Sequence, residues 1–191
     1  MRTSYGFILI HEDIEKLDKS RLESLIGFYK DPEVLLKAVI EGYRFRQHKE
    51  PDIRTKQMLE KALKMNLQNL TGPLQMTSIR DFTQITHCQI SIDNAERLAR
   101  KLSFSIENKV ISIAGFDETV FQLCIYENGT RLTRHQIGDA IEEFGLQFKL
   151  GDVKTIGENL NISFETAERF VYETDLFRIE KYLKDFCNKE Q

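Results

Sequence analysis

Asn128 and Gly129 stand between two runs rich in apolar residues, and this dipeptide restricts the local fold more than any other feature of the sequence. A two-residue turn of type I′ needs positive φ at both of its central positions, which Asn tolerates and Gly prefers. The pattern therefore predicts a β-hairpin in which Glu127 lies opposite Thr130.

The segment before this hairpin extends the prediction to a three-stranded antiparallel meander over residues 110–137, with Val110–Ala114 as its first strand. Because the turn sets the pairing of two regular strands, the predicted register places Gln122 opposite His135. Cys124 then lies on the same face as that pair. Both faces of the middle strand carry apolar side chains, so we expect it to be covered on both sides.

The first part of the chain predicts a helical subdomain over residues 1–72. Capping signals at Ser20, at Pro32 and at Pro51 each begin a run of apolar residues at helical spacing. Ser4–Ile10 is a short apolar run that suits either a strand or the start of a buried helix, and we favour the strand.

Residues 73–191 predict an α+β domain. Apolar residues alternate over 86–92 as they do in a strand, and a helix with an apolar stripe follows from Ala95 to Leu102. With the first strand of the meander these elements form a βαβ-like unit whose two strands run parallel. We therefore expect a small mixed sheet of about four strands, covered by helices that include a C-terminal helical layer.

The composition restricts the compartment and the partners. With 41% hydrophobic residues, 30% charged residues and a net charge of −3, the chain has no overall basic field for nucleic acid or for an anionic membrane. Its three cysteines show no disulfide framework, and its apolar runs are too short for a secretory leader or a membrane span. We expect a cytoplasmic protein without a membrane partner, and the sequence leaves the oligomeric state open.

Charge is unevenly distributed along the chain. Residues 37–64 contain eight Lys or Arg against four Asp or Glu, whereas residues 139–191 contain seven against twelve. In addition, a turn with a phenylalanine beside two carboxylates precedes the middle strand of the meander. The candidate interaction surface consists of Arg44, Arg46, Lys49, Arg54, Lys56, Phe116, Asp117 and Glu118.

These residues support two interpretations. Cations beside aromatic rings bind phosphates or single-stranded bases, but they also form the solvated end of many helical hairpins. Since no catalytic signature accompanies them, we favour a non-enzymatic protein that binds another macromolecule, and we expect that macromolecule to be a protein.

The segment Val153–Val171 resembles a helix-turn-helix of the kind found in transcriptional regulators. The packed positions of this motif correspond to Ile156, Leu160, Ile162, Ala167 and Phe170. Gly157 corresponds to the close approach between the two helices, and Ser163 to the cap of the second helix. The resemblance implies a DNA-binding regulator as the alternative function. The surface of the expected recognition helix carries three glutamates and one arginine: Glu165, Glu168, Glu173 and Arg169. Phosphates repel such a surface, so this alternative ranks second.

A third hypothesis is a small hydrolase or transferase with Cys124 as nucleophile and His135 as base. No oxyanion loop or orienting carboxylate accompanies the pair. His87 and Cys88 are neighbours in the expected strand over 86–92, so they point to opposite faces and do not share a metal ion. The glycines form no phosphate-binding loop. We therefore assign no catalytic residue, no metal ligand and no cofactor.

Overall fold

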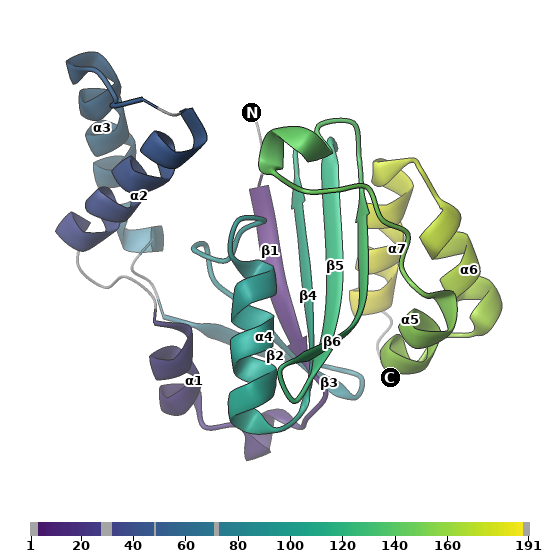
Figure 1. Cartoon of the computed structure of the whole chain (residues 1–191). Coiled ribbons are helices and arrows are strands. Elements are labelled where there is room, and N and C mark those ends of the chain that lie inside the picture. The colour runs from purple at the N-terminus through teal and green to yellow at the C-terminus, as the bar shows by residue number, and fades with distance from the viewer. Residues whose placement is uncertain (1–3, 28–31, 48, 71–72, 189–191) are drawn as a thin grey trace. The chain divides into compact units, whose positions relative to one another are not determined.

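The computed structural model of the 191-residue chain describes residues 4–27, 32–47, 49–70 and 73–188 (Figure 1). Its contacts divide the chain into two compact units, one made of Met1–Ile26 with Leu74–Gln191 and the other of Gly27–Pro73. The predicted domain boundary near residue 72 lies at the end of the second unit. Residues 1–26, which precede the second unit, are grouped with residues 74–191, which follow it.

The first unit contains a sheet whose six described strands have the order β2-β3-β1-β4-β5-β6. The strands are β1 Ser4–Ile10, β2 Gln75–Ile79, β3 Phe82–Thr86, β4 Lys109–Phe116, β5 Val120–Glu127 and β6 Thr130–Ile137. Every neighbouring pair is antiparallel. The α+β class is confirmed, but the expectation of a mixed sheet with about four strands is wrong.

The two additional strands are β2, which forms a hairpin with β3, and β1, which joins the sheet by long-range pairing. β1 lies between β3 and β4 and makes antiparallel pairs with both, so β3 and β4 run in the same direction without touching. The expected parallel pair is therefore interrupted by the N-terminal strand. Ile8, Leu9 and Ile10 are completely buried, which explains why this short apolar run forms a strand inside the sheet.

The strand expected over residues 86–92 is also wrong, because β3 ends at Thr86 and turns follow. Ile90 and Ile92 are nevertheless buried. The loop packs directly on β1, where a Cβ added to Gly6 would lie 2.7 Å from the carbonyl oxygen of Ile90. Burial of Ile90 and Ile92 on the sheet accounts for the apolar residues of the pattern that resembled a strand, whereas Cys88 of the same pattern is exposed.

Helices cover both faces of the sheet. In the first unit they are α1 Lys19–Ile26, α4 Ala95–Ile106, α5 Val153–Leu160, α6 Phe164–Tyr172 and α7 Leu176–Asn188, with short 3-10 helices η1 Ile14–Lys16 and η2 Ile141–Phe144. α4 packs on β4 and β5, and the C-terminal helices α5 to α7 lie over the other face (Figure 1). The middle strand of the meander is thus buried on both sides.

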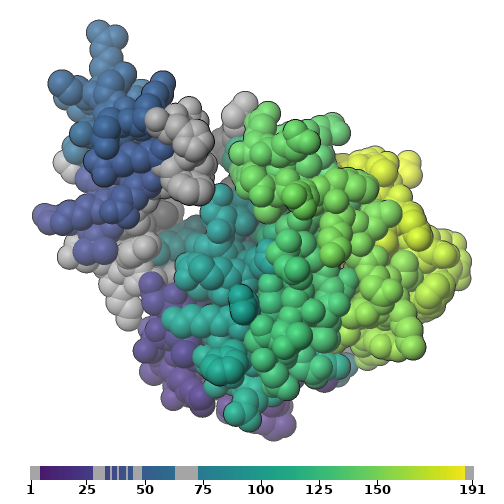
Figure 2. Space-filling model, viewed as in Figure 1, coloured from purple at the N-terminus to yellow at the C-terminus, as the bar shows by residue number. Residues whose placement is uncertain are grey.

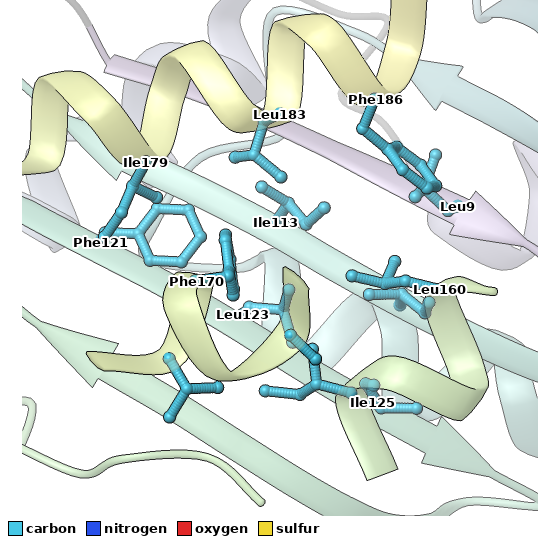
Figure 3. Packing of buried hydrophobic residues seen from close by; sticks show 14 of the residues in the cluster. Leu9, Ile113, Phe121, Leu123, Ile125, Leu160, Phe170, Ile179, Leu183 and Phe186 are labelled. Atoms are coloured by element: carbon cyan, nitrogen blue, oxygen red, sulfur yellow. The ribbon is translucent and has the colours of Figure 1, made fainter. Parts of the chain in front are cut away.

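The C-terminal helices form the main hydrophobic core with the sheet. Figure 3 shows Leu183 of α7 over Ile113 of β4 and Ile179 of α7 beside Phe121 of β5, with Phe170 of α6 beside Leu123 of β5. Ile113, Leu123 and Ile179 have no exposed surface. Full burial of such a side chain contributes about 1.5–3 kcal/mol, so this layer supplies much of the stability of the first unit.

The turn between β5 and β6 has the predicted conformation, with φ of 50° at Asn128 and 75° at Gly129. Glu127 pairs with Thr130, as predicted. The Gly129 N–H also donates a hydrogen bond of 3.0 Å to the Ser103 hydroxyl, which connects the turn to α4.

The register beyond this turn differs from the prediction because the pairing is irregular between Ile125 and Tyr126. Tyr126 pairs with Arg131 as predicted, but Ile125 pairs with Thr133. Leu132 is the extra residue of a β-bulge and is partly exposed. From Thr133 onward each side chain of β6 therefore lies on the face opposite to the predicted one.

The second unit is a helical hairpin of α2 Pro32–Gln47 and α3 Ile53–Leu70. Asp52 caps α3, because its carboxylate accepts a hydrogen bond of 2.7 Å from the Thr55 N–H. Both helices agree with the predicted starts at Pro32 and Pro51 within a few residues.

Candidate functional site

A polar network connects the first turn of α4 to the last two strands of the sheet. Glu96 Oε1 accepts a hydrogen bond of 2.6 Å from the Tyr126 hydroxyl and forms an ion pair of 3.2 Å with Arg131 Nη1. Arg134 Nη2 binds the same oxygen. The space-filling view shows α4, in teal, beside the green surface of the β5–β6 hairpin (Figure 2).

The β-bulge is what brings the two arginines together. Arg131 and Arg134 are three residues apart, so in a regular strand their side chains would point to opposite faces. The extra residue, Leu132, changes this relation and lets both guanidinium groups reach Glu96. The sequence pattern assigned Glu96 only to a helix start; the polar residues on an otherwise apolar strand face were the available signal for a site.

The network is ionised as two cations and one anion at neutral pH. Burial by itself would raise the pKa of Glu96, but hydrogen bonds from Tyr126 and Arg134 lower it below its usual value. Burial, together with the hydrogen bond to Glu96, raises the pKa of Tyr126 to about 12. Burial, with the charge of Glu96, likewise raises the pKa of Cys124 to about 12. The Tyr126 phenol and the Cys124 thiol therefore stay protonated at neutral pH, and the two arginines with Glu96 give the site a net charge of +1.

Next to this network lie side chains that we name the polar strip: Ser112, Gln122, Arg134 and Gln136. Gln122 pairs with Gln136 in the sheet, and Cys124 pairs with both Ser112 and Arg134, so the strip occupies two adjacent rows across β4, β5 and β6. Ser112, Gln122 and Gln136 are each 1% exposed. The strip therefore forms a buried polar surface on the face of the sheet that α4 covers.

Each member of the polar strip has one atom without a hydrogen-bond partner among the described residues. These atoms are Ser112 Oγ, Gln122 Oε1, Arg134 Nε and Gln136 Nε2. An unpaired buried polar group costs about 1–3 kcal/mol unless water pairs with it.

Cys124 and His135 do not form the nucleophile and base of the third hypothesis. Because of the bulge, His135 lies opposite Leu123 instead of Gln122, on the face away from Cys124. Neither side chain has exposed surface. This hypothesis is wrong, since the two groups are separated by the sheet and closed off from solvent.

His135 instead belongs to the core under α6. Its ring packs against those of Phe170 and Phe121, with centroids 5.6 and 5.9 Å away. Nδ1 accepts a hydrogen bond of 3.3 Å from the Gly151 N–H, so the proton of the neutral ring lies on Nε2. Burial lowers the pKa of His135 to about 4.

The residues of the predicted interaction surface belong to both units. The five cations, on or beside the α2–α3 connection, are Arg44, Arg46, Lys49, Arg54 and Lys56. Arg44, Lys49 and Arg54 are exposed, and Arg44 Nε forms an ion pair of 2.6 Å with Glu50. The side chain of Arg46 lies outside the described residues.

The remaining predicted residues lie in the first unit, where β4 ends. Phe116 is the last residue of β4 and is partly buried, with its ring centroid 5.0 Å from that of Phe144. Asp117 and Glu118 adopt positive φ of 48° and 54° in the turn that follows, and Glu118 is exposed. Packing on Phe144 therefore removes part of the Phe116 ring from the surface.

The α2–α3 hairpin exposes apolar side chains. Among the described side chains of α2 and α3, none is buried. Ile53 and Met58 are 75% and 72% exposed, and Val34 is also exposed. Other apolar residues are only partly buried: Leu36, Val39, Ile40 and Leu59. The hairpin therefore presents an apolar surface, and the whole segment Gly27–Pro73 contains nine Lys or Arg against six Asp or Glu.

The helical hairpin of α5 and α6 has the expected packing. The Ser163 hydroxyl accepts a hydrogen bond of 3.2 Å from the Thr166 N–H, and a Cβ added to Gly157 would lie 3.3 Å from that of Ala167. The exposed Glu165 carboxylate binds the Arg169 guanidinium at 2.6 Å. The one cation on this helix surface is thus paired with an acid, and DNA binding by this segment stays a prediction.

Two other kinds of site are absent from the part of the chain that the structure describes. It contains no group of three or more His, Cys, Asp and Glu side chains arranged to hold a metal ion. Among the described helices, none combines the length and apolar character needed to cross a bilayer. Comparison with protein families, curated proteins and solved structures found no match to this chain.

Proposed function

We propose that this chain is a non-enzymatic protein-binding module whose docking element is the α2–α3 hairpin. One observation carries this proposal. Both helices have apolar residues at helical spacing, yet among their described side chains none is buried. A helical hairpin that leaves side chains such as Ile53 and Met58 in contact with water is expected to pack against another protein surface.

Physical chemistry supports a need for such a partner. Isolated helices are marginal in water, and most helical stability in proteins comes from burial of an amphipathic face. Ile53 and Met58 are largely exposed, and Val34 is 43% exposed. Covering side chains of this size contributes roughly 1–2 kcal/mol each, so docking of the hairpin stabilises the unit as well as the complex.

Charge favours a second copy of this chain as the partner. The segment Gly27–Pro73 carries nine cations and six anions, a net charge of +3. The rest of the chain has the remaining 18 Lys or Arg and 24 Asp or Glu, a net charge of −6. Opposite charges on the two units suit a head-to-tail contact between copies.

The surface of α6 and α7 supplies a matching set of groups. Phe164, Tyr172 and Phe177 are exposed there. Glu165 and Glu168 are exposed on the same helix as the first two rings. Exposed aromatic residues on a helix that also carries exposed acids are suited to bind an apolar and basic hairpin.

The test is sedimentation velocity of the full chain over a series of concentrations at low and at high salt. We expect reversible association that weakens as salt rises, because the charges on the two surfaces are screened. Met58→Glu should abolish association. Phe104→Glu is the matched control, because Phe104 of α4 is also 72% exposed but lies outside the hairpin.

Two results would contradict the proposal. A chain that stays monomeric at every concentration and salt excludes the second copy as partner. Association that Met58→Glu leaves unchanged shows that the hairpin is not the docking element.

A further inference from the structure

We propose that the outer edge of β2 pairs with β2 of a second copy of this chain, antiparallel about a twofold axis at Thr77. This pairing rests on the proposed function, because it adds a second contact between copies that the α2–α3 hairpin holds together. Four features of β2 support it: its unprotected edge, its exposed side chains, the direction of its backbone groups and the fit of the strand to itself.

The two edges of the sheet differ in how they are protected. At the β6 edge, Gln136 and Lys149 exchange two backbone hydrogen bonds of 2.8 and 2.9 Å, and the bulge at Leu132 interrupts the strand. β2 has the other edge, and among the described residues its only strand partner is β3. The segment Leu74–Ile79 contains no charged residue and no proline, and its register with β3 is regular. β2 therefore lacks the charge, proline and bulge that usually prevent pairing at an edge.

Solvent reaches the middle of β2. Gln75, Thr77 and Ser78 are exposed, and Met76 is half-buried. The segment Leu74–Ile79 has only its two end residues buried in the core. The segment is thus anchored at both ends, and the residues between them are accessible to another chain.

The backbone of β2 presents hydrogen-bonding groups at this edge. A turn of two residues joins β2 to β3, so Ile79 and Phe82, which flank the turn, form a hydrogen-bonded pair. Because bonding alternates along an antiparallel strand, the N–H and C=O groups of Met76 and Ser78 point away from β3. Water binds these groups in a single copy, and a second strand takes the place of that water.

A second β2 strand fits this edge. With the axis at Thr77, Met76 of each copy lies opposite Ser78 of the other, and these two pairs form four backbone hydrogen bonds. Thr77 lies opposite its own counterpart, which is a favourable cross-strand pair. No like charges meet along the strand, and the Arg80 guanidinium of the turn lies 4.5 Å over the Phe186 ring of α7.

The size of this contact links it to the hairpin. Stable complexes bury about 1,200–2,000 Å² in total, and a pair of five-residue strands is a small contact by this standard. The strands therefore pair between chains that the hairpin contact already holds at a high effective concentration. Each hairpin docks on the other copy, so both contacts share one twofold axis.

The experiment is disulfide crosslinking of the full chain at a concentration where it associates. Thr77→Cys is introduced into a chain whose exposed Cys88 is replaced by serine, and oxidised glutathione is added. In the proposed register the two Thr77 Cα atoms are about 4.5 Å apart, which is within the range of a disulfide. Gln75→Cys is the matched control, because Gln75 is equally exposed but lies roughly 13 Å along the strands from its counterpart. The Thr77→Cys chain should form a covalent dimer at least about tenfold faster.

A second pair of variants tests the backbone without new thiols. Proline is tolerated on an edge strand where its nitrogen faces solvent, so Ser78→Pro should keep the fold but remove an outward N–H group. Sedimentation velocity should show association weakened about tenfold or more. Ser78→Ala keeps the backbone donor and should associate like the unaltered chain. If Ser78→Pro does not fold, the crosslinking rates decide.

The outcomes separate this inference from the proposed function. Equal crosslinking of Thr77→Cys and Gln75→Cys in a chain that associates would overturn the strand pairing and leave the hairpin contact standing. Unchanged association of a folded Ser78→Pro would do the same. Adding Met58→Glu to the Thr77→Cys chain should slow crosslinking. Crosslinking that Met58→Glu leaves unchanged would support the strand pairing and contradict the hairpin as docking element, whereas a chain that never associates overturns both.

Discussion

His135 makes the stability of the first unit sensitive to mild acid. Its ring is fully buried between Phe121 and Phe170, and Nδ1 accepts the Gly151 N–H. Burial lowers its pKa from 6.5 to about 4 in the folded protein. The unfolded chain therefore binds a proton more tightly than the folded chain, and protonation favours unfolding. The stability contributed by the neutral ring is present above pH 6.5 and is lost as pH falls toward 4.

The magnitude follows from the two protonation equilibria. The pKa is 6.5 in the unfolded chain and about 4 in the folded protein. The free energy of unfolding therefore falls by about 2 kcal/mol between pH 7 and pH 5, and by about 3 kcal/mol between pH 7 and pH 4. This is a large fraction of the roughly 5–15 kcal/mol that stabilises a typical domain. Carboxylates also lose favourable interactions in acid, so the measurement must compare two proteins.

The assay is urea unfolding of the unaltered protein and of His135→Gln at pH 7 and pH 5. We expect the unaltered protein to lose about 2 kcal/mol more than the variant between these two values, because glutamine does not titrate. His11→Gln, at an exposed position, is the control and should behave like the unaltered protein. Equal losses for the unaltered protein and His135→Gln would refute the reasoning, as would an NMR titration of His135 with a midpoint near 6.5.

Two further predictions concern backbone space and thiol access. Gly138 has φ of 129°, and an added Cβ would lie 2.1 Å from the carbonyl oxygen of Thr119, so Gly138→Ala should lower the free energy of unfolding by about 3 kcal/mol or more. Gly145 also has positive φ, but an added Cβ there would meet no atom within 4 Å. Urea unfolding of Gly145→Ala should therefore show a free energy of unfolding lower by only about 1 kcal/mol. Equal losses for the two variants would show that the close contact at Gly138 has no cost of its own. In the folded protein, a thiol reagent should modify the exposed Cys88 but not the sealed Cys124 until urea is added. Rapid modification of Cys124 under native conditions would show that the sheet opens at this strand.

Local features were predictable wherever neighbouring residues supply the whole physical cause. The Asn128–Gly129 turn needs only two residues that accept positive φ, and both adopt it. The capped start of α6 at Ser163 follows from one hydroxyl and one backbone N–H. The sequence also predicted that β5 is covered on both sides, because apolar side chains occur on both of its faces.

The polar network around Glu96 was not predictable in the same way. Regular alternation places Arg131 and Arg134 on opposite faces, and it places His135 on the face of Cys124. The bulge at Leu132 places Arg131 and Arg134 on one face and His135 on the face away from Cys124. Its position depends on how β6 packs against α4 on one side and against α6 on the other. One extra residue in the pairing thus decided which groups meet.

By itself, then, the sequence determined the Asn128–Gly129 turn, the cap of α6 at Ser163 and the apolar stripes, since each arises from interactions within a few residues. The predicted cap at Ser20 is wrong, because α1 begins at Lys19 and Asp18 accepts the hydrogen bonds of its first N–H groups. Only the tertiary structure decided that Ser4–Ile10 lies between β3 and β4, and that a bulge gathers a carboxylate and two arginines beside the polar strip. Both outcomes depend on the burial of surfaces from segments far apart in the chain. The free energy of that burial exceeds local preference, so local patterns cannot reveal it.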